Sequence, residues 1–473
     1  MATDGASTRV ERDSMGELPV PADAYYGAST QRAVLNCPIS NARFGRYFIR
    51  AIGLLKRAAA ETNRDLGLLE PRLADVVIRA AGEVAEGKLD AEFVADVYQT
   101  GSGTTTNMNA NEVIANRAAE LLGGSKGDRS VHPNDHVNLG QSSNDIFPTA
   151  MQLAGLDAIE HELIPALQAL QSACEAKSRE FWDVVKTGRT HLQDATPIRL
   201  GQEFLGYAGQ AERAIRRLRF AQDELREVPL GGTAVGTGIN MHPEFAVRVS
   251  ARVNEITGLG IYETTNHFQA QSTIDAVVVS GGVLSAISAS LMKVANDLRW
   301  LGSGPRAGIG EIDLPAVQPG SSIMPGKVNP VIAEALTMVC SQVIGNSVTI
   351  TLAGQSGNFE LNVQQTVAAH NLVESVVLLA KAVDNFVKQC VVGIRATETG
   401  PRMVASGLAI GTALAPTIGY DAAAAIAKEA ARSGRTIREV AREQTSLSNA
   451  DLDQILDPAS MTEPGFSGAS AGG

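Results

Sequence analysis

Residues 320–330, with the sequence GSSIMPGKVNP, combine two serines, a lysine and an asparagine with two glycines and two prolines. Hydroxyl, ammonium and amide groups are side-chain donors for carboxylate or phosphate oxygens. Glycine and proline disfavour regular helix or strand. The segment is therefore predicted to be a loop that can present Ser321, Ser322, Lys327 and Asn329 to an anion.

A nucleotide phosphate is excluded by the spacing. A phosphate-binding loop requires G-x-x-x-x-G-K-[ST], whereas here the GK pair begins six residues after Gly320 and Lys327 is followed by Val328. The glycine-rich stretch GGTAVGTG at 231–238 also lacks the spacing and the strand–helix context of a dinucleotide fingerprint. The anion that this loop binds is thus expected to be a different one.

Four other segments gather polar residues where a core or a linker would not need them. Each has a structural explanation, because Ser, Thr and Asn favour helix N-caps and turns, and a single histidine or lysine is more often structural. Their joint occurrence favours a composite site. They are TGSGTTTNMN (100–109), VHPNDHVN (131–138), GQSSND (140–145) and TGRTHLQDATP (187–197).

Long helices are expected to position these segments. Apolar residues separated alternately by three and four positions form one seam along a helix, which is typical of helices packed side by side. Strand signals are sparse, so the fold is predicted to be mainly α. Several such seams exceed what one core needs, which predicts oligomerisation. The seams are Leu284–Ile287–Leu291–Val294–Leu298, Ile332–Leu336–Val339–Val343 and Leu372–Val376–Leu379–Val383–Phe386–Cys390.

Further helices are expected at about 149–178, 199–226, 242–257 and 422–433, the third with Pro243 in its first turn. The expected domains are an N-terminal mixed and helical domain at 1–138, a central long-helix bundle at 139–396 and a small helical domain at 397–473. The tail is expected to be disordered from about 458. The stretch Ala276–Met292 holds four serines and two glycines, so a buried helix is expected there, not a membrane span.

Composition narrows the partners and the compartment. A formal net charge of −11 argues against nucleic acid or an anionic membrane as the main partner. The four cysteines are widely separated and include no C-x-x-C pair, which excludes a local metal clip and fits reduced thiols. The first residues carry acids and no apolar signal region. A cytoplasmic protein without a membrane anchor is expected.

Two of these segments resemble the sequence signatures of a known enzyme superfamily. GSSIMPGKVNP resembles the signature of the fumarase/aspartase superfamily, and TGRTHLQDATP resembles that of the class II, iron-independent fumarases. The similarity runs from about Arg9 to the C-terminal helices. It implies a three-domain, mainly α fold whose long helices form the core of a homotetramer, with each active site built from three subunits. It also implies reversible hydration of fumarate to (S)-malate in the tricarboxylic acid cycle, with no cofactor and no metal.

The resemblance assigns roles residue by residue. Ser321 is implied as the base that removes a proton from carbon, and His191, with Glu334 as its charge partner, as the group that handles the water proton. Lys327 and Asn329 are implied to hold the aci-carboxylate intermediate. The implied substrate-binding residues are Ser102, Thr104, Ser142, Ser143, Asn144, Thr190, Ser322, Lys327 and Asn329; the implied secondary anion site consists of Arg129, His132, Asn134 and Asp135.

These roles make physical sense. Fixed donors aimed at a developing charge are the main means of stabilising such an intermediate. A serine acts as a base only if backbone N–H groups or a cation stabilise its alkoxide, whereas imidazole titrates near neutrality without help. Gly320 and Gly326 allow the loop to open and close as a lid. Asn329 also has a structural interpretation, as an N-cap with Pro330 at the first helical position, and Glu334 as a carboxylate favoured by the helix dipole.

Two alternatives remain. Aspartate ammonia-lyases share the opening loop and HPNDHVN but typically carry glutamine where this chain has His191. Thr105 and Thr106, after GSGT, are closer to those enzymes. His191 favours the fumarase interpretation. A non-enzymatic structural protein with the same fold is the second alternative, and the presence of all the polar residues argues against it.

Overall fold

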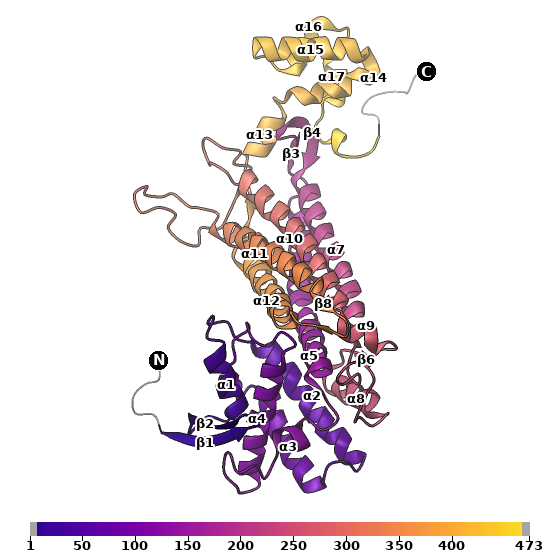
Figure 1. The fold of residues 1–473 in the computed structure, drawn as a ribbon. Coiled ribbons are helices and arrows are strands. Elements are labelled where there is room, and N and C mark those ends of the chain that lie inside the picture. Colours follow the sequence, from indigo (N-terminus) through magenta and orange to yellow (C-terminus); the bar gives the residue numbers. More distant parts are fainter. Residues whose placement is uncertain (1–6, 466–473) are drawn as a thin grey trace. The chain divides into compact units, whose positions relative to one another are not determined.

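The computed structural model describes residues 7–465, and their contacts divide the chain into two compact units. The first unit comprises residues up to 165, 216–289 and 339–381, and the second comprises 166–215, 290–338 and the residues from 382 onward. Five helices contribute residues to both units: α6 (Ile164–Glu180), α7 (Leu200–Arg226), α10 (Asp275–Leu301), α11 (Val331–Gly354) and α12 (Gln365–Gln389) (Figure 1).

The fold is mainly α, as predicted. Within the described residues, strands form only two-stranded sheets, β1–β2, β3–β4, β5–β6, β7–β10 and β8–β9. The long-helix seams are buried as expected: Leu284, Leu291 and Leu298 of α10 are each at most 3% exposed. The prediction of packed long helices is therefore confirmed at the level of individual side chains.

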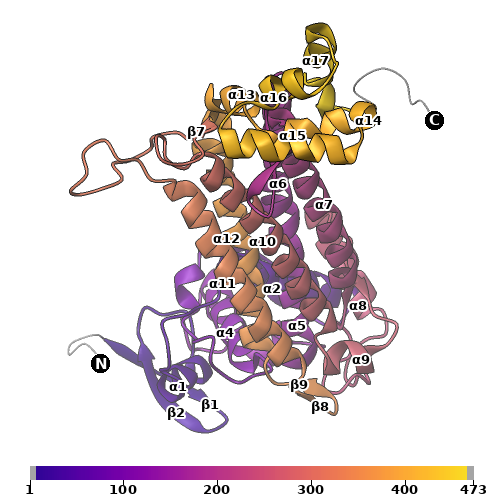
Figure 2. The same cartoon turned by 90° about the horizontal axis from the view of Figure 1, so that it is seen from above.

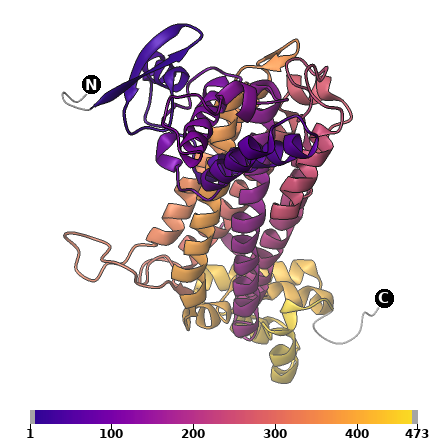
Figure 3. The same cartoon turned by 90° about the horizontal axis from the view of Figure 1, so that it is seen from below.

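The first unit begins with a hairpin of β1 (Thr8–Asp13) and β2 (Gly16–Pro21), the indigo ribbon of Figures 2 and 3. Helix α2 packs closely on α3, and a Cβ on Gly53 would lie 2.7 Å from the Ala85 backbone nitrogen. The remaining elements that lie wholly in this unit are α1 (Ala28–Asn36), α2 (Arg46–Asp65), α3 (Pro71–Ala85), η1 (Asp90–Glu92), α4 (Thr104–Leu121), η2 (Pro133–Val137), α5 (Ser143–Ala158), η3 (Ile159–Leu163), β5 (Glu227–Val228), α8 (Phe245–Thr257), β6 (Tyr262–Glu263), α9 (His267–Ser272), β8 (Gly357–Asn358) and β9 (Leu361–Asn362).

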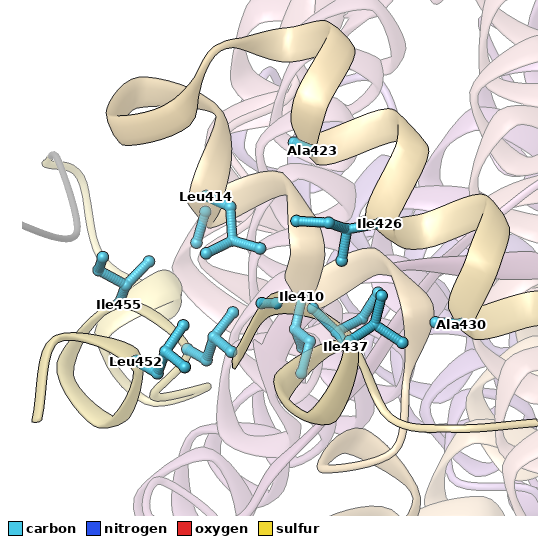
Figure 4. Close-up of a cluster of buried hydrophobic side chains, with 12 residues drawn as sticks. Ile410, Leu414, Ala423, Ile426, Ala430, Ile437, Leu452 and Ile455 are labelled. Atoms are coloured by element: carbon cyan, nitrogen blue, oxygen red, sulfur yellow. The ribbon is translucent and has the colours of Figure 1, made fainter. Parts of the chain in front are cut away.

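The second unit holds the C-terminal helices, whose apolar side chains form their own core (Figure 4). Thr436 and Ser448 form capping boxes with the acidic residues three positions later, which fix the starts of two of these helices. The elements of this unit are β3 (Val185–Thr190), β4 (Gln193–Arg199), β7 (Ile312–Asp313), η4 (Val391–Gly393), β10 (Arg395–Ala396), α13 (Thr399–Val404), η5 (Leu408–Leu414), α14 (Ala415–Ile418), α15 (Tyr420–Ser433), α16 (Ile437–Gln444), α17 (Asn449–Ile455) and η6 (Ser460–Thr462).

Several expected boundaries differ from the structure. The helix expected at 149–178 begins at Ser143 and continues through the π-turn η3 into α6, so Pro148 lies inside it. The helix expected from 242 begins at Phe245, after Pro243. Order continues beyond 458, because Arg199 Nε donates to Thr462 Oγ1 at 2.9 Å; residues 466–473 of the expected tail lie outside the described residues. The domain boundaries at 138 and 396 stay predictions.

Helix α10 is longer than the stretch Ala276–Met292 expected from sequence. By length and composition, α10, α11 and α12 could each cross a membrane. Ser280 and Ser288 are fully buried in α10. Each hydroxyl donates to the carbonyl four residues earlier at 2.8 Å, which satisfies the hydroxyls without a partner from another helix.

Candidate functional site

The segment between α10 and α11 forms extended loops that reach away from the helices (Figures 1 and 2). Its last part, residues 318–330, is called the serine loop below. The Gly320 N–H donates to the Lys327 carbonyl at 2.9 Å, and Asn329 Nδ2 donates to the Gly320 carbonyl at 2.7 Å. A Cβ on Gly320 would lie 2.5 Å from the Lys327 carbonyl oxygen. Only glycine therefore allows this closure of the loop.

Ser321 lies inside that closure. Its Oγ accepts hydrogen bonds from the backbone N–H groups of Ile323 at 3.2 Å and Met324 at 2.9 Å. Donors aimed at an oxygen favour its ionised form. Such donors would stabilise the alkoxide form of Ser321, which a serine needs in order to act as a base.

Two further polar residues of the serine loop face solvent. Ser322 and Lys327 are exposed, and within residues 7–465 the Lys327 ammonium makes no ion pair. Asn329 does not cap α11, because its amide donates back to Gly320. The helix begins at Val331, one residue later than expected, and the Pro330 carbonyl accepts the first helical bond, from the Glu334 N–H, at 3.0 Å. Lys327 is thus free to meet an anion.

His191 sits at the tip of the β3–β4 hairpin, which the sequence did not reveal. Thr190 pairs with Gln193, so His191 and Leu192 form a two-residue turn with φ values of 56° and 59°. Such turns normally use Asn and Gly, because a positive φ is strained for other residues by about 1–3 kcal/mol. The histidine is exposed, and so is the preceding Thr190. Surrounding structure must hold this strained turn in place.

Two buried and two half-buried charges hold the hairpin, and they are called the ion quartet below. Lys186 Nζ lies 2.7 Å from Glu203 Oε1 and 3.1 Å from Glu311 Oε2. Arg189 binds the same Glu311 carboxylate through two bonds, of 2.8 and 3.0 Å. The side chains of Lys186 and Glu311 are each 1% exposed. Two cations and two carboxylates compensate one another, which is the condition for burying such charges.

The ion quartet also reaches the segment that precedes the serine loop. The Glu311 N–H donates to the Leu301 carbonyl at 2.9 Å, and Thr397 N–H donates to the Glu311 carbonyl at 3.1 Å. Burial raises the pKa of Glu203, and Lys186 opposes that shift. Sequence reasoning missed Glu203 and Glu311 because each looks like a surface glutamate when its partners, up to 122 positions away, are unknown.

The expected charge pair between His191 and Glu334 is not formed within the described chain. No ion pair or hydrogen bond joins the two side chains. His191 ends a hairpin, whereas Glu334 lies in the first turn of α11, where the helix dipole favours a carboxylate. A single chain therefore places the two groups in separate elements and supports only the dipole interpretation of Glu334.

In the first unit, Ser102 and Thr104 flank a tight turn before α4. Their hydroxyl oxygens lie 3.0 Å apart, and Ser102 is 6% exposed. Gly103 between them has a φ of 75°, and a Cβ there would lie 1.9 Å from the ring of Phe147. Glycine is therefore required for α4 and α5 to approach each other at this turn.

Ser142, Ser143 and Asn144 form the start of α5. Ser142 is the N-cap and exchanges hydrogen bonds with Asp145, as its structural interpretation predicted. Ser143 Oγ accepts from Asn107 Nδ2 at 2.9 Å, and Asn144 Nδ2 donates to the Ala234 carbonyl at 2.8 Å. Free N–H groups and the helix dipole favour an anion at such a terminus. The contacts between α4 and α5 bring this cluster beside the Ser102 turn.

The expected secondary anion residues are arranged around the π-turn η2. His132 Nδ1 lies within hydrogen-bonding distance of the N–H groups of Asn134, at 3.3 Å, and Asp135, at 3.1 Å. Arg129 has a φ of 59° and donates to the Arg12 carbonyl. Asn134 and Asp135 are exposed. The His132 ring thus shapes a surface turn.

Thr105 and Thr106, the two residues that favour the ammonia-lyase alternative, both have hydrogen-bond partners within the protein. Thr106 is 2% exposed, and its Oγ1 donates to Gln99 Oε1 at 2.9 Å. Thr105 Oγ1 donates to Thr100 Oγ1 at 3.2 Å. Neither hydroxyl needs a substrate to explain it. Within residues 7–465, no three His, Cys, Asp or Glu side chains are grouped so as to hold a metal ion.

Comparison with known proteins identifies the family of this chain. The lyase family profile matches residues 16–345, and the profile of the fumarase C C-terminus matches 410–463. A class II fumarate hydratase from Halobacterium salinarum is 53% identical over 459 residues, which cover 97% of this chain and 98% of that protein. The chain belongs to the class II fumarate hydratase family.

Other members of this fumarase family are similarly close. A class II fumarate hydratase from Methylorubrum extorquens is 50% identical over 97% of each chain. A solved class II fumarase from Schistosoma mansoni superposes with a TM-score of 0.93 at 38% identity, over 96% of this chain and 99% of that one. A fumarate lyase:delta crystallin from Brucella melitensis, solved with cobalt, also gives 0.93, at 45% identity over 97% and 100%. The fold prediction is thereby confirmed.

Proposed function

We propose that this protein hydrates fumarate reversibly to (S)-malate. The observation that carries the proposal is the pair of backbone N–H groups on Ser321 Oγ, at 2.9 and 3.2 Å, in a loop that also exposes Lys327. Full-length similarity to class II fumarate hydratases supports the same substrate. A small dicarboxylate is thus the proposed ligand.

The chemistry is written most simply from malate. The Ser321 alkoxide takes the proton from the carbon next to one carboxylate, and the electron pair moves into that carboxylate as an aci-carboxylate dianion. Lys327 and Asn329 stabilise that charge as it forms. The pair then forms the double bond while the hydroxyl on the neighbouring carbon leaves with a proton delivered by His191. The products are fumarate and water, and hydration runs the same steps backward.

The remaining polar residues are proposed to bind the substrate. Ser102, Thr104, Ser142, Ser143, Asn144, Thr190 and Ser322 supply hydroxyl and amide donors for its carboxylates and for the reacting water. Arg129, His132, Asn134 and Asp135 are proposed to form the secondary anion site. Fixed donors cost no reorganisation when charge develops, which is why hydroxyls and amides suit this purpose.

We also propose a homotetramer whose active sites each draw on three subunits, in the cytoplasm. Only 28% of the most apolar stretch of α11 is buried within one chain. Met338, Val348 and Leu352 on that helix are each more than 50% exposed. A second copy could cover this face, and it could also bring Glu334 to the His191 of a neighbour. The four thiols are free, in accord with a reducing compartment.

The test is an activity assay with fumarate, malate and aspartate, with and without ammonia. The proposal expects loss of fumarate absorbance without ammonia and without added metal. Turnover only with aspartate, or only when ammonia is added, would assign an ammonia-lyase instead. No turnover of any of the three by folded protein would favour a structural role.

A further inference from the structure

Helix α2 carries a lysine at a fully buried position. Lys56 is 0% exposed, and its Nζ donates to Asn138 Oδ1 and Gln141 Oε1 at 2.8 Å each. Within residues 7–465 it forms no ion pair. Burying a charge that no carboxylate contacts directly costs several kcal/mol, and an apolar residue in its place would cost less. Packing alone therefore does not explain why this position holds a lysine.

The side-chain amide of Asn138 links Lys56 to two asparagines of α4. Asn138 Oδ1 also accepts from Asn107 Nδ2 and Asn111 Nδ2, at 3.2 Å each. Asn138 Nδ2 donates to the Gln141 carbonyl at 3.1 Å. Because every neighbour of Asn138 Oδ1 is a donor, the amide of Asn138 has one orientation, and the NH2 groups of Asn107 and Asn111 must point toward it.

The next link ends at the start of α5. Asn107 Nδ2 donates to Ser143 Oγ at 2.9 Å. The Asn107 carbonyl oxygen is buried and has no protein partner among the described residues, so this side chain acts through its NH2 group alone. Since Ser143 Oγ receives a hydrogen from Asn107, its own hydrogen is free to point elsewhere. Ser143 is half-buried, at a helix terminus that favours anions.

We propose that Lys56 is a positioning residue, which acts through Asn138 and Asn107 to keep the Ser143 hydroxyl as a donor toward a substrate carboxylate. The inference rests on the proposed function, because it takes Ser143 to bind the dicarboxylate. The donor and acceptor roles in this series of hydrogen bonds follow from what each group can do. Lys56 donates to Asn138 Oδ1, which leaves that oxygen as an acceptor for Asn107 Nδ2, and Asn107 Nδ2 in turn donates to Ser143 Oγ.

The charge state of Lys56 does not change these roles. Burial lowers the pKa of Lys56 to about 7, and the Asp145 carboxylate opposes the shift. Both the ammonium and the neutral amine carry at least two N–H groups. Two are sufficient for Asn138 and Gln141, so the hydroxyl of Ser143 is expected to remain a donor on both sides of neutrality.

The test is a double-mutant cycle on full-length enzyme, with KM and kcat measured for fumarate. Ser143→Ala is expected to raise KM about tenfold, because a bond to a charged group is lost. Lys56→Met is expected to raise KM by about fivefold and to change kcat less. The double variant is expected to match Ser143→Ala, because both changes remove the same contact. Arg57→Met, a half-buried neighbour on α2 that pairs with Glu61, serves as control and should leave KM unchanged.

Asn107→Leu covers the case in which Lys56→Met does not fold, since leucine suits a helix and resembles asparagine in size. It too should raise KM, with no further rise when combined with Ser143→Ala. Multiplicative KM effects, or KM values within twofold of wild type for both Lys56→Met and Asn107→Leu, would overturn the proposal. An unchanged KM in Ser143→Ala would overturn it together with the substrate contact of Ser143. The hydratase activity itself is judged separately on the wild-type enzyme.

Discussion

Two regions of the second unit carry the proposed proton-transfer groups, and they are held in opposite ways. His191 lies on a paired hairpin whose strained turn is fixed by the ion quartet. Ser321 lies on a loop closed by a few bonds of its own, with Ile323 83% exposed beside it. An imidazole needs only to be oriented toward the substrate. A serine needs hydrogen-bond donors on its oxygen as well, and the loop itself supplies them. A rigid hairpin thus suits the histidine, whereas a loop that closes on itself suits the serine.

The largest effect is expected from Ser321→Ala. Loss of the proposed base should lower kcat by more than about 10²-fold, the range of a positioned proton-transfer group. Steady-state kinetics with malate measures it. Turnover close to wild type would remove Ser321 from this role and leave the serine loop as a lid only.

His191→Asn should have the next largest effect, a fall in kcat of about 10- to 100-fold. Loss of the imidazole should also flatten one limb of the pH profile of kcat, because that profile reports the essential acid and base of the enzyme–substrate complex. Measuring kcat across the pH range checks both parts. An unchanged profile would assign the water proton to another group.

Glu311→Gln tests whether the ion quartet positions the hairpin. Removing one carboxylate leaves Lys186 and Arg189 short of a counter-charge, which typically costs about 3–5 kcal/mol of folding free energy. The variant should therefore melt earlier and should lower kcat about tenfold with little change in KM. Glu360→Gln, an exposed glutamate in no ion pair among the described residues, is the matched control. Equal melting of the two variants would argue against the quartet.

Two glycines of the serine loop separate closure from backbone strain. Alanine at 320 would place its Cβ 2.5 Å from the Lys327 carbonyl oxygen, whereas alanine at 326 meets nothing within 4 Å and suffers only from the φ of 80°. Gly320→Ala should lower kcat/KM about tenfold, and Gly326→Ala less, since αL strain costs about 1–2 kcal/mol. A larger loss in Gly326→Ala would contradict the importance of closure.

The smallest effect is expected at the hairpin turn. Leu192→Gly should relieve strain at a φ of 59° and raise the free energy of unfolding by up to about 1 kcal/mol, partly offset by the flexibility of glycine in the unfolded chain. Gln193→Gly, in a strand, should instead lower stability. Denaturant unfolding compares the two, and destabilisation by Leu192→Gly would show that the turn is not strained.

The two regions also differ in how far the sequence could reveal them. The composition of 320–330 predicted a loop, and the need for an activated serine predicted N–H donors on its oxygen, because these are local properties. The long-helix seams were equally readable from their periodicity. The hairpin under His191 was not, since neither residue of its turn favours a positive φ. The ion quartet that holds the hairpin joins Arg189 to Glu311, which is 122 positions away. No local sequence pattern predicts such a contact.

The proposed role of Ser321, activated by the Ile323 and Met324 N–H groups, is to remove the carbon-bound proton. Its most direct test is the initial rate at which (S)-malate gains deuterium at its C3 carbon in D2O, followed by NMR for wild type and Ser321→Ala. Ser321→Ala is expected to lower this rate by more than about 10²-fold, while (S)-malate binding, measured separately by calorimetry, is retained. Exchange within about twofold of wild type would contradict this role.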